Sequence, residues 1–160
     1  LLTQTVALSL RGVPAVYIHS LLATPNDVAG VERTGRIRSI NRRKWDVREL
    51  DRLLAEPGSA HARVLAEYRR RLSLRRAQPA FHPDVEQVYW ESGSDHVLGF
   101  ERRCDQQDIL VVANVGNAPA AVPVPARYAG AHDLMSSMST TVTEYVTIEP
   151  AQIMWLEARN

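Results

Sequence analysis

The sequence predicts an α/β part followed by an all-β part, and two observations support this prediction. Near the start, an apolar periodic segment is followed by a glycine turn and a short apolar run at residues 13–18, VPAVYI. This is the order of a helix and a strand buried on both faces. After Pro79 the chain changes to short β-rich runs with turn signals about ten residues apart, the spacing of an antiparallel β-sandwich. We therefore expect two parts, residues 1–79 and 80–160, with their boundary between Pro79 and Pro83.

The start of the chain is expected to be the end of a helix, because Leu2, Val6 and Leu10 lie four positions apart on one face. An Arg-Gly pair ends this helix, and the apolar strand expected at residues 13–18 follows directly. A helix, a tight turn and a doubly buried strand make one α/β unit, since a parallel sheet needs covering helices. Because the chain begins with Leu inside a helical pattern, we expect it to be a fragment of a longer protein.

A long polar segment follows at residues 19–44, and it is dense in arginine. In parallel α/β folds the loops at the carboxyl ends of the strands carry the substrate-binding groups. Long connections of this kind are uncommon elsewhere in compact domains. The sequence therefore predicts a functional loop directly after the expected strand.

Two helices are predicted after this loop. Asp46, with Glu49 three positions later, resembles a capping box and marks the start of the first helix. Ser59 caps a second, longer helix. The arginines clustered at 69–71 and 75–76 are expected on the solvated face of that helix rather than in a binding patch.

The all-β part is expected to consist of short strands that follow one another closely. The expected strands are Val88–Trp90, Val97–Arg102, Ile109–Asn114, Ala120–Val124, Thr141–Ile148 and Gln152–Leu156. We expect Trp90 and Trp155 to lie in the core of the sandwich rather than to serve as platforms on which a sugar stacks.

Composition excludes several classes of protein. A formal net charge of +1 gives no support for nucleic-acid binding, and no apolar run is long enough to span a bilayer. Cys104 is the single cysteine, which excludes an internal disulfide and favours a reducing, cytoplasmic compartment. The histidines lack the spacing of metal ligands, and no glycine-rich phosphate loop follows a strand. We therefore expect no metal and no cofactor.

Four stretches in this order resemble glycoside hydrolase family 13, the α-amylase superfamily. RGVPAVY at 11–17 looks like the eighth strand of its (β/α)8 TIM barrel, and LSLRRAQPAF at 72–81 is similar to the segment after the last barrel helix. ILVVAN at 109–114 and IEPAQIMWL at 148–156 resemble strands of its C-terminal domain. The resemblance implies the C-terminal end of a TIM barrel (last strand, active-site loop and last helices) followed by an antiparallel β-sandwich domain.

The loop is similar to that of the sucrose phosphorylase subfamily. HSLLA at 19–23 with Asn26 and Asp27, and TGR followed by RSINR at 38–42, look like its G-x-L-A-G-x-N-D and G-R-D-I-N-R motifs. The opening and the ending are closer to the glucosylglycerate phosphorylase branch. Ser39 replaces the aspartate of the second motif, and Lys-Trp replaces the tyrosine pair that follows it, so the acceptor stays open.

The resemblance implies a retaining α-glucoside phosphorylase, a glycosyltransferase that converts a small α-glucoside such as glucosylglycerate, with inorganic phosphate, to α-glucose 1-phosphate. In the family the catalytic carboxylates lie on earlier barrel strands, so we expect no catalytic residue in this chain and no activity of the chain alone. A sucrose phosphorylase, an α-amylase-type hydrolase and, in another class, a non-catalytic carbohydrate-binding β-module stay open as alternatives. A homodimer is compatible with the sequence.

Arg38 is the leading candidate for substrate binding, since by the resemblance the first arginine of R-x-I-N-R binds the glucosyl ring. Its planar guanidinium can span two adjacent hydroxyls. The other candidates are His19, Asn26, Asp27, Arg36, Asn41 and Arg42. For Asn41, Arg42 and His19 a purely structural role in the loop is an open alternative. At an acceptor site, arginine would suit phosphate or a glycerate carboxylate.

Overall fold

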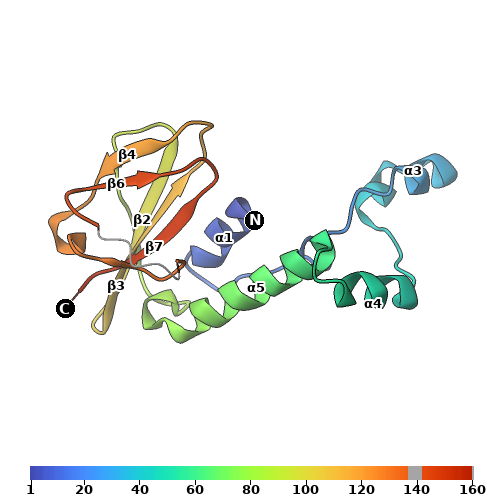
Figure 1. Ribbon diagram of the computed structural model, residues 1–160, viewed down its shortest axis with the longest axis horizontal. Helices are drawn as coiled ribbons and strands as arrows, with labels where there is room; N and C mark the ends of the chain where they lie inside the picture. Colours follow the sequence, from blue (N-terminus) through green and yellow to red (C-terminus); the bar gives the residue numbers. More distant parts are fainter. Residues whose placement is uncertain (137–141, 160) are drawn as a thin grey trace. The chain divides into compact units, whose positions relative to one another are not determined.

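The computed structural model describes residues 1–136 and 142–159 (Figure 1). The chain forms two compact units: Leu1–Pro14 together with Arg71–Asn160, and Ala15–Arg70. These units do not coincide with the partition into 1–79 and 80–160 expected from the sequence. The first helix, at residues 2–9, and the end of the long helix, from Arg71, belong to the same unit as the β-structure. The partition at residue 79 itself stays a prediction.

The first unit is built on two antiparallel sheets. One has five strands in the order β1-β2-β3-β7-β5, and the other pairs β4 with β6 (Figure 1). The bounds are β1 Gln87–Tyr89, β2 Val97–Cys104, β3 Gln107–Asn114, β4 Ala120–Pro123, β5 His132–Asp133, β6 Tyr145–Ile148 and β7 Ile153–Glu157. Strands at all six expected places are thus present, although β6 begins later than expected and Thr141 lies outside the described residues. The two-residue β5 is too short to leave a pattern in the sequence.

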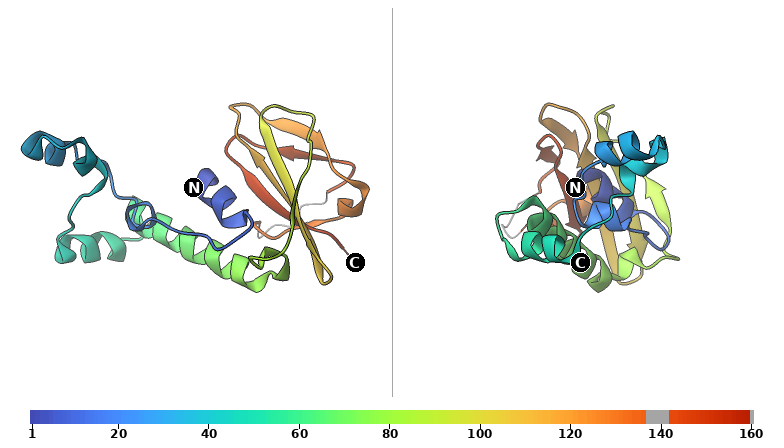
Figure 2. Two further views of the ribbon diagram at one scale, coloured as in Figure 1. Left: turned by 180° about the vertical axis from the view of Figure 1, so that it is seen from behind. Right: turned by 90° about the vertical axis from the view of Figure 1, so that its right-hand side faces the viewer.

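The central strand β3 is buried on both faces, and its side chains alternate between two apolar cores. Leu110 and Val112 face the β4–β6 pair, in a core that also contains Val122, Val146 and Ile148. The opposite face packs against Phe81 and the apolar side of helix α1, Leu2–Ser9 (Figure 2). The core positions of that second face are Phe100, Ile109, Val111, Ala113, Ile153 and Trp155. Trp155 is fully buried and Trp90 packs at the edge of the first core, as expected.

Two arginine side chains of the long helix donate to backbone carbonyl groups at both ends of α1; the last carbonyl groups of a helix have no partner inside it. Arg75 donates to the carbonyl oxygen of Leu8 at 2.6 Å and to that of Gly12 at 3.0 Å. Arg71 donates to the carbonyl oxygen of Leu1 at 3.2 Å. The clustered arginines were expected mostly on a solvated face, and Arg71 and Arg75 are two that instead bind the backbone. Their partners are more than sixty positions away in sequence, so no local pattern announces them.

The second unit consists of short helices and the start of a long one. They are α2 Ile18–Leu21, α3 Val28–Thr34, the 3-10 helix η1 Ile37–Asn41, α4 Val47–Ala55 and α5 Ala60–Ala77, which continues into the first unit. The predicted caps are confirmed. The Asp46 carboxylate accepts from the backbone N–H of Glu49 at 3.0 Å, and the Ser59 hydroxyl accepts from that of Ala62 at 2.9 Å. The Glu49 side chain turns instead to Arg43, at 2.9 Å.

The strand expected at residues 13–18 is not formed. Residues 13–17 are extended but pair with no strand among the described residues, and α2 begins at Ile18. Val13 is 83% exposed. A strand that is apolar on both faces forms only between neighbouring strands, and the strands of this chain pair with one another in the first unit. No helix in the described part of the chain is long and apolar enough to cross a membrane.

Candidate functional site

The loop at residues 19–44 is folded into a compact lobe by hydrogen bonds that converge on Asp27. Its carboxylate accepts from the backbone N–H of Gly30 at 2.8 Å and so caps α3. Its own backbone N–H donates to the carbonyl oxygen of Ile40 at 2.7 Å, which joins the start of α3 to η1. Gly35 ends α3 with a φ of 64°, a left-handed conformation that glycine adopts without strain. Asp27 is therefore a structural residue of the lobe.

Three of the predicted residues come together in η1 and beside it. Arg36, Arg38 and Arg42 line one hollow of about 540 Å³, together with Gly35, Ile37 and Ser39. All three arginine side chains are exposed. No carboxylate is among the described residues that line this hollow, so its charge is positive throughout. Such a surface is suited to a carboxylate or phosphate group, because guanidinium donors match the oxygens of these anions in pairs.

A second hollow of about 540 Å³ shares Arg38 and Arg42 with the first and adds Tyr17 and Asn41. The Tyr17 hydroxyl donates to the backbone carbonyl oxygen of Asn41 at 2.7 Å. This bond ties the end of η1 to the extended segment before α2. The Asn41 backbone is thus structural, while its exposed side chain stays available at the hollow.

His19 lies beside this second hollow through its contact with Tyr17. The two rings meet edge to face, with their centroids 5.2 Å apart. The Nδ1 atom of His19 is 3.1 Å from the hydroxyl oxygen of Thr24, which also accepts from the indole N–H of Trp45 at 3.0 Å. Asn26 is exposed in the turn before α3 and lines neither hollow.

The candidate residues predicted from the sequence do not include Tyr17, Thr24 or Trp45, although Tyr17 and Thr24 contact His19 and Trp45 donates to Thr24. Trp45 carried one signal, since it stands where the similar subfamily has tyrosine. Thr24 gave none, because its two partners lie 5 and 21 positions away and no periodicity relates them. No group of three or more metal-ligating side chains occurs in the described ranges.

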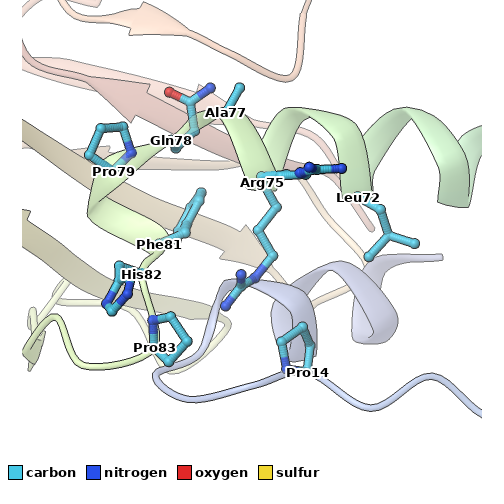
Figure 3. Close-up of a pocket in the computed structure, with 10 residues that line it drawn as sticks. Pro14, Leu72, Arg75, Ala77, Gln78, Pro79, Phe81, His82 and Pro83 are labelled. Atoms are coloured by element: carbon cyan, nitrogen blue, oxygen red, sulfur yellow. The ribbon is translucent and has the colours of Figure 1, made fainter.

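A further hollow of about 510 Å³ lies in the first unit, where α5 ends (Figure 3). Its lining is mainly apolar and includes Pro14, Leu72 and Phe81. Figure 3 shows Arg75 reaching from α5 across this hollow, toward the segment that follows α1. Its guanidinium is already bonded to two carbonyl groups there, so we assign this hollow to the packing of α1 and not to a ligand.

Comparisons with known proteins fit the resemblance seen in the sequence. No protein-family model matches the chain. The glucosylglycerate phosphorylase of Allomeiothermus silvanus is 40% identical over 122 residues, which are 76% of this chain and 22% of that protein. The protein of the same name from Escherichia coli K12 is 32% identical over 157 residues, 98% of this chain and 28% of its own length. The chain therefore spans between a fifth and a third of the curated relatives that it matches.

Solved structures define the fold. The trehalulose synthase MutB of Pseudomonas mesoacidophila MX-45 superposes with a TM-score of 0.70 at 19% identity, over 99% of this chain and 38% of its own. A second structure of that synthase, a mutant in complex with Tris, gives a TM-score of 0.73. The expected fold class, the end of a (β/α)8 barrel enzyme with a β-sandwich domain, is confirmed by these neighbours. The chain belongs to glycoside hydrolase family 13, as a C-terminal part like that of its sucrose phosphorylase and glucosylglycerate phosphorylase members.

Proposed function

We propose that this chain is part of a retaining α-glucoside phosphorylase that acts on glucosylglycerate or a related small α-glucoside. The enzyme would transfer the glucosyl group to inorganic phosphate and release α-glucose 1-phosphate. The observation that carries this proposal is the similarity to curated glucosylglycerate phosphorylases, which in one case extends over 98% of the chain. The catalytic carboxylates would come from the part of the enzyme outside this chain.

The positive charge of the lobe supports an anionic acceptor. In a retaining mechanism the bond from the anomeric carbon to the glycerate oxygen breaks while a carboxylate of the enzyme takes the glucosyl group. A second carboxyl group of the enzyme protonates the glycerate oxygen, and glycerate leaves. That group would then take a proton from phosphate as a phosphate oxygen attacks the same carbon and releases the first carboxylate. Both the departing and the entering group are anions, so one set of guanidinium donors would serve them in turn. Arg36, Arg38 and Arg42 form such a set.

Within this set we assign the glucosyl ring to Arg38 and the acceptor anion chiefly to Arg36 and Arg42. Arg38 and Arg42 line both hollows, so both would lie between donor and acceptor positions, and the likeness of RSINR at 38–42 to the subfamily motif supports Arg38 for the ring. His19 and the Asn41 side chain would complete the acceptor side, next to Tyr17. Asn26 would reach the acceptor only at the outer edge of the lobe.

The proposal is tested on the full-length enzyme with glucosylglycerate and sucrose offered side by side, with and without phosphate. We expect α-glucose 1-phosphate only when phosphate is present, and more from glucosylglycerate. Release of glucose that does not depend on phosphate would contradict a phosphorylase and favour a hydrolase. A strong preference for sucrose would instead identify a sucrose phosphorylase.

Variants then test the assignment of residues. Arg38→Gln is expected to lower kcat/KM for every glucoside by about 10- to 100-fold, since a hydrogen bond to a charged group contributes about 1.5–3 kcal/mol. Arg36→Gln is expected to raise KM for phosphate while kcat changes little. Arg33→Gln is the matched control, because Arg33 is also exposed but lies on α3 outside both hollows. Equal effects of Arg33→Gln and Arg38→Gln would remove the assignment.

A further inference from the structure

A chain of hydrogen bonds connects three side chains of the second unit that are distant in sequence. The indole N–H of Trp45 is only a donor, so the hydroxyl oxygen of Thr24 accepts from it, at 3.0 Å. A hydroxyl has one hydrogen to donate, and the Nδ1 atom of His19 lies 3.1 Å from the same oxygen. The Trp45 N–H occupies one of the two lone pairs of this oxygen, so the hydroxyl remains able to donate its hydrogen to Nδ1 of His19.

The first member of this chain is held firmly. The Arg43 guanidinium lies 4.1 Å from the centre of the Trp45 ring, and it is anchored in turn by Glu49 of α4 at 2.9 Å. His61 of α5 also contacts the indole edge to face, with ring centroids 5.3 Å apart. The Nδ1 atom of His61 is 2.6 Å from the carbonyl oxygen of Leu22, at the end of α2. The indole is therefore fixed by two helices and by the start of the lobe.

The last member of the chain faces the candidate site. A hydroxyl that donates to Nδ1 makes this nitrogen the acceptor and leaves the proton of a neutral imidazole on Nε2. The ring of His19 is also fixed by its edge-to-face contact with Tyr17, which lines the hollow of Arg38 and Arg42. The hydrogen bond and the ring contact together hold the direction of the imidazole.

We propose that Thr24 and Trp45 are positioning residues, which hold His19 as an Nε2–H donor to an oxygen of the acceptor anion beside Arg38 and Arg42. This inference rests on the proposed function, because the anion is the phosphate or glycerate of that reaction. Neither residue touches the anion, and no covalent step involves them. Their role is to keep one donor of the acceptor site in a single protonation and orientation.

Steady-state kinetics of the full-length enzyme test this role. With α-glucosyl fluoride as donor, the leaving group is a fluoride ion, which carries no carboxylate to compete with phosphate, so transfer to phosphate is measured by itself. Thr24→Val removes the hydroxyl and keeps the shape of the side chain. It is expected to raise KM for phosphate about tenfold, the effect of one lost hydrogen bond to a charged group, while kcat at saturating phosphate changes little. Thr24→Ser keeps the hydroxyl and is expected to restore KM.

A double-mutant cycle separates positioning from mere packing. His19→Gln alone is expected to raise KM for phosphate by at least as much as Thr24→Val, and the double variant to be no worse than His19→Gln. Trp45→Phe keeps the ring but removes its N–H, and is expected to raise KM in the same direction by a smaller factor. Thr147→Val, at an exposed position of β6, is the matched control and is expected to change nothing.

The outcomes distinguish this inference from the proposed function. A wild-type enzyme that shows no phosphate-dependent transfer would overturn the proposed function itself. A phosphate-dependent wild type whose KM is unchanged in Thr24→Val, Trp45→Phe and His19→Gln would overturn only the positioning role. An effect of Thr24→Val that adds in full to that of His19→Gln would also overturn it, because the two residues would then act independently.

Discussion

Replacing Arg102 by methionine should destabilise the first unit, because this arginine is fully buried and joins three segments. Its guanidinium donates to the carbonyl oxygen of Ser9 at 2.9 Å, to that of His82 at 2.8 Å and to that of Val85 at 3.3 Å. The methionine side chain would fill the same channel but offer no donor. The end of α1 and the segment after α5 would each lose a hydrogen-bond partner.

Two opposing effects set the magnitude. Burial, together with the nearby Arg75 and Arg11 cations, lowers the pKa of Arg102 to about 10, so the buried cation is itself unfavourable. That shift corresponds to about 3 kcal/mol, which the methionine variant would regain. Against this, the two shorter bonds contribute about 1.5–3 kcal/mol each, and the carbonyl groups left without a partner cost about 1–3 kcal/mol. The net expectation is a loss of about 2–4 kcal/mol in the free energy of unfolding.

Urea unfolding of the chain, followed by the fluorescence of the buried Trp155, measures this loss. Trp155 is a suitable reporter because its indole N–H donates to the Ser9 hydroxyl at 2.8 Å, at the end of α1. Arg76→Met is the matched control, since Arg76 is exposed on α5, and it should change stability by less than about 0.5 kcal/mol. If the Arg102→Met variant were as stable as the wild type, these carbonyl groups would not need the guanidinium as a hydrogen-bond partner.

Three further predictions concern other parts of the structure. Burial raises the pKa of Tyr128, and the hydroxyl has no hydrogen-bond partner within the described residues. Above pH ~10 the unfolded state releases this proton while the folded state keeps it, so stability falls by about 1.4 kcal/mol per pH unit. Tyr128→Phe should leave stability at pH 7 nearly unchanged and remove this part of the fall, as alkaline urea titrations would reveal. Gly99→Ala would place a methyl group 2.8 Å or less from the ring of Trp90, so its urea midpoint should drop by the equivalent of about 2 kcal/mol, whereas Gly58→Ala, in open space, should be neutral. Asp27→Ala removes the cap of α3 and should speed amide exchange there about fivefold, for a cap contribution of about 1 kcal/mol; exchange as slow as in the wild type would show that the cap is dispensable.

Features set by local chemistry could be predicted from the sequence. Asp46 and Ser59 cap helices through bonds to residues three positions away, and the strands of the β-sandwich follow the short β-rich runs between turn residues. The expected strand at 13–18 failed for the opposite reason. Its apolar character is local, but a strand exists only when other strands lie beside it.

The candidate site also has one part that local sequence predicts and one part that depends on contacts between distant residues. Arg36, Arg38 and Arg42 share one short helix and its flanks, so their neighbourhood follows from their spacing. The bond of the Asp27 N–H to Ile40 and the bonds of Thr24 to two distant rings depend on how the lobe closes. No local sequence pattern predicts these bonds. The same holds for Arg71 and Arg75, whose partners belong to a helix at the other end of the sequence.

Asp27 accepts from the N–H of Gly30 and donates its own N–H to Ile40, and these two bonds hold residues 28–39 in place. We call this stretch the cassette. One residue fastens the beginning of α3 and, through Ile40, the end of η1. Arg36 and Arg38 lie inside the cassette, whereas Arg42 and the Asn41 carbonyl that receives Tyr17 lie just beyond it. Grafting residues 28–39 from a relative would thus exchange two guanidinium groups in one step and leave the frame around them intact, which makes this cassette a natural unit for redesigning acceptor preference.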